Sequence, residues 1–216
     1  MKTARKAIML VLCVVLLVVA SVMGTLAYLT AEDTVTNTFT VGNIQINLDE
    51  TDVTKTDGSR TEAGNAYHLL PGQTYVKDPT VTILAKSDES YVRMLVTVSD
   101  INEMKAAFPK DRYATWYDEK DNFLLQNLVT GWDKTLWECT GINGGVYEFR
   151  YTSKVNTMDG NPLVLDALFD NIVVPDTMTN IDIAHLNNAT ITVNAHAIQA
   201  AGFANAADAW DHFSTT

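Results

Sequence analysis

Four histidines are the side chains of this 216-residue chain that most readily suggest metal or acid–base chemistry: His68, His185, His196 and His212. They lie far apart, and none belongs to a His-Glu-x-x-His pattern, which would place two zinc ligands on one helix face. A zinc site that the fold assembles from His68, His185 or His196 with carboxylates stays open. The alternative is that each histidine lies on a strand or loop and that its imidazole hydrogen-bonds to the backbone.

Neither the cysteines nor the charged runs match a catalytic motif. Cys139 alternates with Trp137 in an expected strand and has no histidine near it in the sequence, so we interpret it as a core thiol. The Gly-rich stretch 141–145 lacks the lysine of a phosphate-binding loop. Acidic runs at 49–52 and 118–121 do not match a twelve-residue calcium loop. The sequence therefore predicts no catalytic residue, no cofactor and no metal.

Aromatic side chains offer a different chemistry, the binding of a sugar ring or another surface ligand. Trp116, Tyr117 and Trp132 would be the contact residues if they were exposed. A soluble β-sandwich that binds glycan is therefore one hypothesis. The alternative is that these rings pack in the core or beneath loops.

Residues 1–27 have the layout of a secretory signal peptide. A basic start and an apolar block from residue 7 to 23 are followed by small residues at positions 25 and 27, which predicts cleavage between Ala27 and Tyr28. An uncleaved membrane anchor is the alternative, because about 20 apolar residues suffice to span a bilayer. In that case the chain would contact a membrane only through this segment.

Charge and cysteine usage describe the part that follows this leader. The whole chain is 47% hydrophobic and carries 15 Lys+Arg against 26 Asp+Glu, a formal net charge of −11. The leader holds three of the bases and none of the acids, so the remaining 189 residues have a net charge of −14. Such acidity argues against a nucleic-acid partner, because phosphates require clustered Lys and Arg.

Cys139 is the only cysteine that remains after cleavage of residues 1–27, so no internal disulfide can form, which suits a Gram-positive-type exterior.

Alternation of apolar and polar residues is the main structural signal after residue 37. The expected strands are 39–48, 75–84, 91–98 and 191–198, and a hairpin joins 134–140 to 146–152 around the loop 141–145. The apolar positions change parity at Gly42, which predicts a β-bulge there. Residues 49–66 are polar and predict a long exposed loop.

Short helices are expected between some of these strands. Asp100 is placed to cap one helix, with Glu103 completing a capping box, and Asn205 is placed to cap a terminal one. Residues 180–188 predict another. Many short strands with a few small helices predict a mainly β fold, a jelly-roll-like β-sandwich formed by residues 40–216 as one domain.

The segment that cleavage would expose, residues 28–37, has high β-propensity and contains no glycine or proline. An extended segment of this kind can add to an open sheet edge of the next molecule, where backbone hydrogen bonds give affinity and alternate side chains give specificity. The alternative is a solvated chain end, as is common for termini.

Several short motifs together resemble the TasA/camelysin (CalY) family. The motifs are GTLAYLT at 24–30, NTFTVG at 37–42, LPGQ at 70–73, KDP at 77–79, YVR at 91–93, GVYEF at 145–149, PL at 162–163, AIQAAGF at 197–203 and AW at 209–210. The leader combined with the first strand is the more specific part. Residues 101–135 carry little of the likeness.

The resemblance implies a jelly-roll protein that a SipW-type signal peptidase releases to the cell surface or biofilm matrix. It also implies homopolymeric fibres built by donor-strand complementation, with other matrix components as further partners. Carried over, the donor strand is residues 28–39, beginning at Tyr28, with Leu29, Val35 and Phe39 as side chains that fill pockets. The camelysin branch is described as metallopeptidase, so a cell-surface metalloprotease is the alternative that the resemblance implies.

Overall fold

Residues 42–213 are described by a computed structural model. This part of the chain contains eleven β-strands and three α-helices, and every strand pair is antiparallel, which confirms the expected mainly β fold with a few short helices. The signal segment, the Ala27–Tyr28 cleavage site and the donor segment 28–39 lie outside the described residues.

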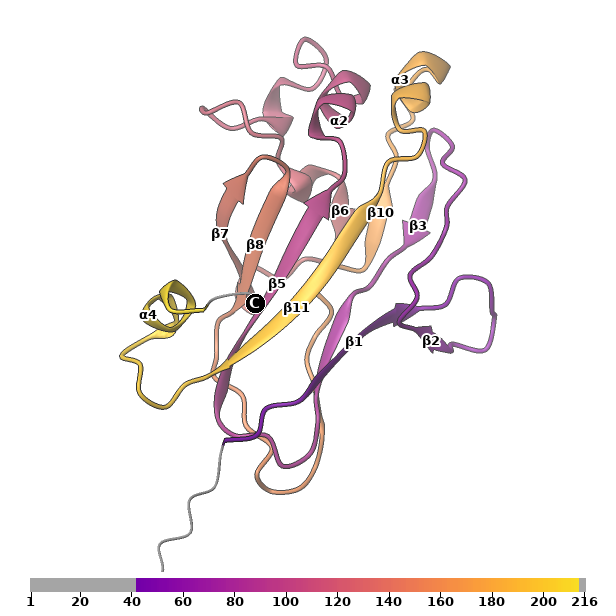
Figure 1. Cartoon of the computed structure of the whole chain (residues 1–216). Coiled ribbons are helices and arrows are strands. Elements are labelled where there is room, and N and C mark those ends of the chain that lie inside the picture. The colour runs from indigo at the N-terminus through magenta and orange to yellow at the C-terminus, as the bar shows by residue number, and fades with distance from the viewer. Residues whose placement is uncertain (1–41, 214–216) are drawn as a thin grey trace, which may run out of the picture. The chain divides into compact units, whose positions relative to one another are not determined.

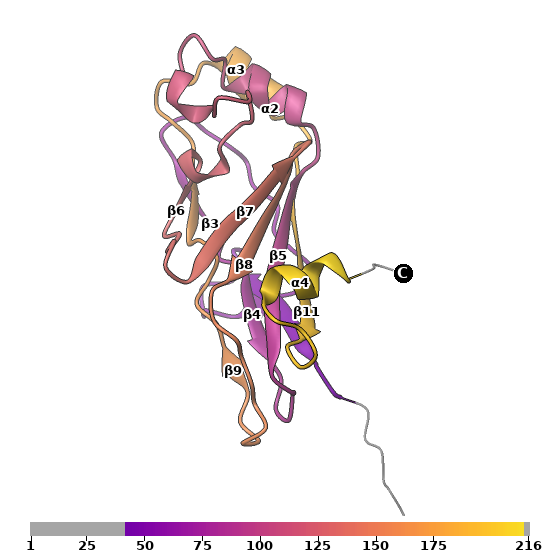
Figure 2. The ribbon, with the colours of Figure 1, turned by 90° about the vertical axis from the view of Figure 1, so that its left-hand side faces the viewer.

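The strands form three sheets, with the orders β2-β1-β4-β9, β3-β10-β6 and β11-β5-β8-β7 (Figures 1 and 2). Their bounds are β1 Ile46–Thr51, β2 Arg60–Thr61, β3 Thr74–Val76, β4 Thr80–Ile83, β5 Ser90–Val98, β6 Val129–Thr130, β7 Trp137–Asn143, β8 Val146–Tyr151, β9 Leu163–Val164, β10 Asn171–Val173 and β11 Ile191–Gln199. The helices are α2 Ile101–Ala107, α3 Asn180–His185 and α4 Ala206–Asp211, with 3₁₀ turns η1 Ala114–Trp116 and η2 Leu125–Asn127.

Strand β5 explains how the alternating sequence builds the core. Its even-numbered residues from Val92 to Val98 are buried, as alternation predicts for a strand with one face inward. In β4 the predicted pair Val81 and Ile83 is also fully buried. Residues from all three sheets contribute to one hydrophobic core, an arrangement consistent with a β-sandwich.

The prediction of one continuous strand over residues 75–84 is wrong. It is divided into β3 and β4, which belong to different sheets, with Lys77, Asp78 and Pro79 between them. Proline has no N–H for a ladder, so it suits the point where the chain leaves one sheet and enters another.

The first predicted strand begins later than expected. Residues 42–45 form no regular strand, so the bulge predicted at Gly42 is wrong; β1 begins at Ile46. Instead the Asn43 N–H donates to a carboxylate oxygen of Asp88 at 2.8 Å. The end of β1 and all of β2 fall inside the predicted loop 49–66, so that loop is shorter than expected.

The hairpin between β7 and β8 is confirmed, but its connection is tighter than predicted. The strands pair as far as Asn143 and Val146, which leaves only Gly144 and Gly145 in the turn. Their φ angles are 56° and 86°, a region that glycine adopts without the steric cost of a Cβ. The ladder is irregular between Cys139 and Gly141.

Helix α2 confirms only half of the predicted capping box. The Asp100 side chain accepts hydrogen bonds from the N–H groups of Asn102 and Glu103, so it caps the helix. The Glu103 carboxylate lies instead 2.7 Å from Nδ1 of His185 in α3, which links the two helices. The reciprocal box is at α3, between Thr179 and Asp182, and the sequence analysis missed it.

Helix α4 is capped by Asn205, as predicted, and packs on the sheet through a second apolar cluster. The cluster comprises Tyr91, Ala200, Ala209 and Trp210, with Ile198, Phe203, Ala206 and Phe213 at its margin. The Arg93 guanidinium of β5 lies 4.3 Å from the Trp210 ring centroid and 4.8 Å from that of Phe213. Cation–π contacts therefore help to hold α4. None of the helices in residues 42–213 is long and apolar enough to cross a membrane.

The first prediction concerns His196, which lies beside this contact. Its Nδ1 is 3.4 Å from Nε of Arg93, and its ring centroid is 5.1 Å from that of Phe213. Burial and the Arg93 charge lower the pKa of His196. The unfolded chain therefore binds more protons than the folded chain as the pH falls below about 6.5, and stability decreases. We expect the melting temperature of the wild type to fall more between pH 7.5 and 5 than that of His196→Gln. Equal pH dependence of the two proteins would contradict this.

Candidate functional site

The most distinctive feature of the described chain is a seam between two strands that no backbone ladder joins. Strand β11 is the edge strand of its sheet, and residues 46–49 of β1 pair only with β4, because β2 pairs only with residues 50 and 51. We call the facing edges of β11 and of residues 46–49 the β1–β11 seam. Figure 1 shows the two strands converging toward the start of β1 and diverging toward its end.

The core is incompletely covered along this seam. In β11, Val193 and Ala195 lie opposite Val96 and Met94, which are buried, so they face the core. They nevertheless stay only partly buried, as do the other inward residues along the seam. The whole set is Ile46, Leu48, Ile191, Val193, Ala195 and Ala197. A further strand with inward apolar side chains would complete the coverage.

The other sheet edges of the described chain are short or blocked. Strands β2, β6 and β9 have two residues each and β3 has three. The Tyr67 hydroxyl donates to the Val76 carbonyl of β3 at 2.7 Å. The ladder of β7 is irregular, and the indole N–H of Trp132 donates to the Trp137 carbonyl at 2.7 Å. Such devices normally stop edges from pairing with other chains.

Strand β11 has none of these devices. Its nine residues pair with β5 without a break in register. No backbone group on its outer edge has a hydrogen-bond partner within residues 42–213. It is therefore the edge of the described chain best suited to accept an added strand.

A pocket of about 230 Å³ lies at the divergent end of the seam. Its walls come from β1, β2, the β3–β4 connection and the start of β11. Apolar lining residues are Leu48, Pro79, Ile191 and Val193, and charged ones are Asp49, Glu50, Glu62 and Lys77. The pocket is thus lined by both apolar and charged side chains.

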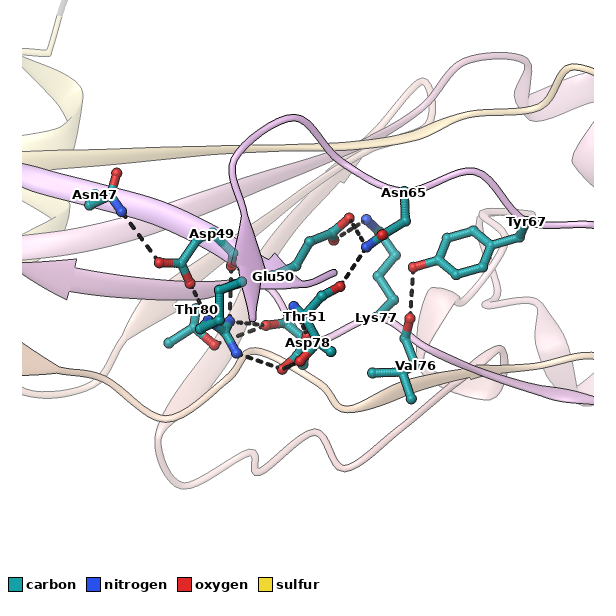
Figure 3. Close-up of polar contacts among 11 residues, drawn as sticks. Asn47, Asp49, Glu50, Thr51, Asn65, Tyr67, Val76, Lys77, Asp78 and Thr80 are labelled. Atoms are coloured by element: carbon teal, nitrogen blue, oxygen red, sulfur yellow. Dashed lines mark hydrogen bonds and ion pairs between the residues drawn. The ribbon is translucent and has the colours of Figure 1, made fainter. Parts of the chain in front are cut away.

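Glu50 and Lys77 form a buried ion pair at this end (Figure 3). Lys77 Nζ lies 2.6 Å from Oε2 of Glu50, and both side chains are 8% exposed. Asn65 Nδ2 donates to the other carboxylate oxygen, Oε1, at 2.9 Å. Burial and the neighbouring Glu50 carboxylate raise the pKa of Tyr67 to about 12.

A second polar network beside it fixes β2 against β1. The Arg60 guanidinium pairs with the carboxylates of Asp49 and Asp78, and it also donates to the Asp49 carbonyl at 3.1 Å. Asp78 in turn accepts from the Thr51 N–H at 2.7 Å. These hydrogen bonds lower the pKa of Asp78 although burial opposes the shift. The network holds the two-residue strand β2 against β1 beside the pocket.

The histidines considered as zinc ligands are not brought together. His185 pairs with Glu103 on α2, and His196 contacts Arg93 on the sheet. His68 is exposed, and its carbonyl accepts from the Tyr75 hydroxyl. Among residues 42–213 no three His, Cys, Asp or Glu side chains are grouped so that they could hold a metal ion.

Cys139 and the three aromatic residues have structural contacts. Cys139 is partly buried against the core, and burial raises the pKa of its thiol, which disfavours the reactive thiolate. Trp116 stacks on Phe108 with centroids 4.9 Å apart, and the Tyr117 hydroxyl donates to the Phe108 carbonyl at 2.6 Å. Trp132 packs edge-on against a core phenylalanine. These rings pack within the fold, as the second of the two sequence interpretations expects.

No family model, curated protein or solved structure matches the chain.

Sequence reasoning did not find the residues of this site. Glu50 and Asn65 lie in the stretch predicted as an exposed loop, and Lys77 lies within the stretch predicted as one strand. The sequence of β11 did contain one signal of an open sheet edge: a long alternation of apolar and polar residues without proline, glycine or lysine. The predicted donor residues Tyr28, Leu29, Val35 and Phe39 lie outside the described residues, so the structure places none of them.

Proposed function

We propose that the mature chain is a secreted structural subunit of extracellular or biofilm-matrix fibres. Residues 28–39 of one copy would enter the β1–β11 seam of the next copy and complete its sheet, giving a jelly-roll-like sandwich. The observation that carries the proposal is the nine-residue open edge of β11 above a half-covered core.

The donor fits the seam in length, and three of its large apolar residues share one face. Nine residues of extended chain span about 30 Å, and twelve span about 40 Å, so residues 28–39 can cover β11 and still leave a short link. Leu29, Val35 and Phe39 have odd numbers, so in one extended strand their side chains point to the same face. That face also carries Asp33 and Asn37, so its apolar contacts with the inward residues of the seam would come from Leu29, Val35 and Phe39.

The position of Gly42 supports exchange between copies. A Cβ built at Gly42 would lie 3.3 Å from Oε1 of Gln199, so the described chain begins at the convergent end of the seam. The pocket lies at the opposite end, beside Ile191. A donor that extends away from Gly42 is free to reach the seam of a neighbouring subunit. Cleavage by a SipW-type signal peptidase after Ala27 would release it, so export and assembly would be coupled.

The test compares residues 28–216 with residues 40–216 by electron microscopy and light scattering. We expect fibres from the longer chain and none from the shorter one, because only the longer chain has the donor. Adding a synthetic peptide of residues 28–39 to the shorter chain should give a one-to-one complex, and a peptide with Val35→Lys should bind much more weakly. Identical fibres from both chains, or fibres from neither, would rule out donor-strand exchange.

A further inference from the structure

The cluster at the divergent end of the seam contains an amine and a carboxamide that both contact one carboxylate. The Glu50 carboxylate bridges the other two, with Lys77 Nζ at 2.6 Å from one oxygen and Asn65 Nδ2 at 2.9 Å from the other. Figure 3 shows the side-chain ends of Lys77 and Asn65 next to each other at this carboxylate. The Lys77 amine would be the nucleophile, and the Asn65 side-chain carbonyl would be the group that it attacks. Both residues are therefore held by one acid–base group, the Glu50 carboxylate.

The Asn65 amide is also held as an acyl-transfer substrate would be. Its Oδ1 accepts from the Val53 N–H at 3.0 Å, and its Nδ2 donates to the Thr51 carbonyl at 2.7 Å as well as to Glu50. A backbone N–H directed at the carbonyl oxygen stabilises the negative charge that develops there when a nucleophile adds. The hydrogen bonds thus orient the carbonyl and place an acid at the leaving nitrogen.

We propose that Lys77 and Asn65 form an intramolecular isopeptide bond, with Glu50 as the catalytic acid–base group. Burial at this site disfavours an isolated charge, so transfer of a proton from the Lys77 ammonium to the Glu50 carboxylate gives a neutral amine and a neutral acid. The amine is then a nucleophile adjacent to a polarised carbonyl.

The atoms and protons of the reaction balance within the cluster. The Nζ lone pair forms a bond to Cγ of Asn65, and the carbonyl pair moves to Oδ1, where the Val53 N–H stabilises it. Glu50 returns its proton to Nδ2, the Cγ–Nδ2 bond breaks as the carbonyl re-forms, and ammonia leaves. Nζ then gives one proton to Glu50, which leaves an ordinary amide. No oxidant or other reactant is required.

The surroundings suit this reaction. Apolar Leu48, Pro79 and Val193 line the pocket beside the cluster together with Glu50 and Lys77, and this pocket gives ammonia a route to solvent. The bond would tie the segment after β2 to the β3–β4 connection. It does not depend on the proposed assembly, because all of its groups lie within one copy.

The test is the intact mass of the purified mature chain. We expect a mass lower than the sequence requires by one ammonia, and the full mass for Lys77→Met, Glu50→Gln and Asn65→Ala. Lys154→Met is the matched control, because Lys154 pairs with an exposed acid, Glu89, and that variant should keep the loss. A protease digest of the wild type should contain a branched peptide in which Lys77 is joined to Asn65.

Two results would overturn the proposal. The first is a wild-type mass equal to that of the sequence, with Lys77 and Asn65 recovered unmodified in the digest. The second is an ammonia loss that persists in Lys77→Met, which would assign it to a succinimide at the Asn143–Gly144 dipeptide. The wild-type digest decides the question even if a variant fails to fold.

Discussion

Replacing Ala195 by lysine should abolish fibre growth while leaving the subunit folded. Ala195 faces the core from β11 but stays partly exposed in the seam, so a lysine stem can extend to solvent in the free subunit. An inserted donor strand would bury the ammonium without a partner, at a cost of at least about 3 kcal/mol. That weakens binding of the donor by about a hundredfold or more, since about 1.4 kcal/mol corresponds to a factor of ten.

The matched control for this change is Asn194→Lys. Asn194 is the neighbouring residue on the same strand, but it is exposed and faces away from the core, so the same charge is added on the opposite face. We expect this variant to form fibres at close to the wild-type critical concentration, measured by sedimentation. Equal loss of fibres in both variants would indicate a charge effect, and normal fibres from Ala195→Lys would exclude the seam as the acceptor.

Removing Glu50 should cause the largest loss of stability among single changes at the site. In the parent chain Lys77 is paired with Glu50 or joined to Asn65 by the proposed cross-link, whereas Glu50→Ala leaves its ammonium buried without a partner, which typically costs about 3–5 kcal/mol. It also removes the acceptor of the Asn65 amide and prevents the proposed cross-link. The measurement is urea unfolding in the Ala195→Lys background, which keeps the chain monomeric.

Glu89→Ala is the corresponding control on the surface. Glu89 and Lys154 form an ion pair at 3.1 Å, but their side chains are 51% and 44% exposed. Exposed pairs of this kind are screened by water and contribute little to stability, so the unfolding midpoint should change little. If the two variants lose similar stability, the buried pair has no special role in holding this end of the fold.

Local sequence patterns correctly predicted the elements that are determined by residues close to one another in the sequence. The alternation of β5 and the Asn205 cap of α4 were read correctly, because each needs only a burial period or one side-chain hydrogen bond. The Thr179–Asp182 box was missed because aspartate replaces the usual Glu or Gln. The division of 75–84 was missed although Pro79 was a signal for it.

The seam and its polar end could not be predicted in the same way. They depend on which strands end beside each other, and β1 and β11 are separated by most of the chain. Glu50, Asn65 and Lys77 belong to no recognisable sequence motif. They come into contact only because β1, the segment after β2 and the β3–β4 connection lie together in the fold. Non-local pairing of this kind leaves no periodic signal in a single sequence.

The opposite placement of Gly42 and the pocket has a consequence for the proposed fibres. The contact surface that gives the donor differs from the one that receives it, so the contact is heterologous and repeats without closing into a dimer. Every subunit then points the same way, and the filament has two chemically different ends. One end presents an empty seam and the other a free donor. A subunit without the donor would therefore cap growth at one end only.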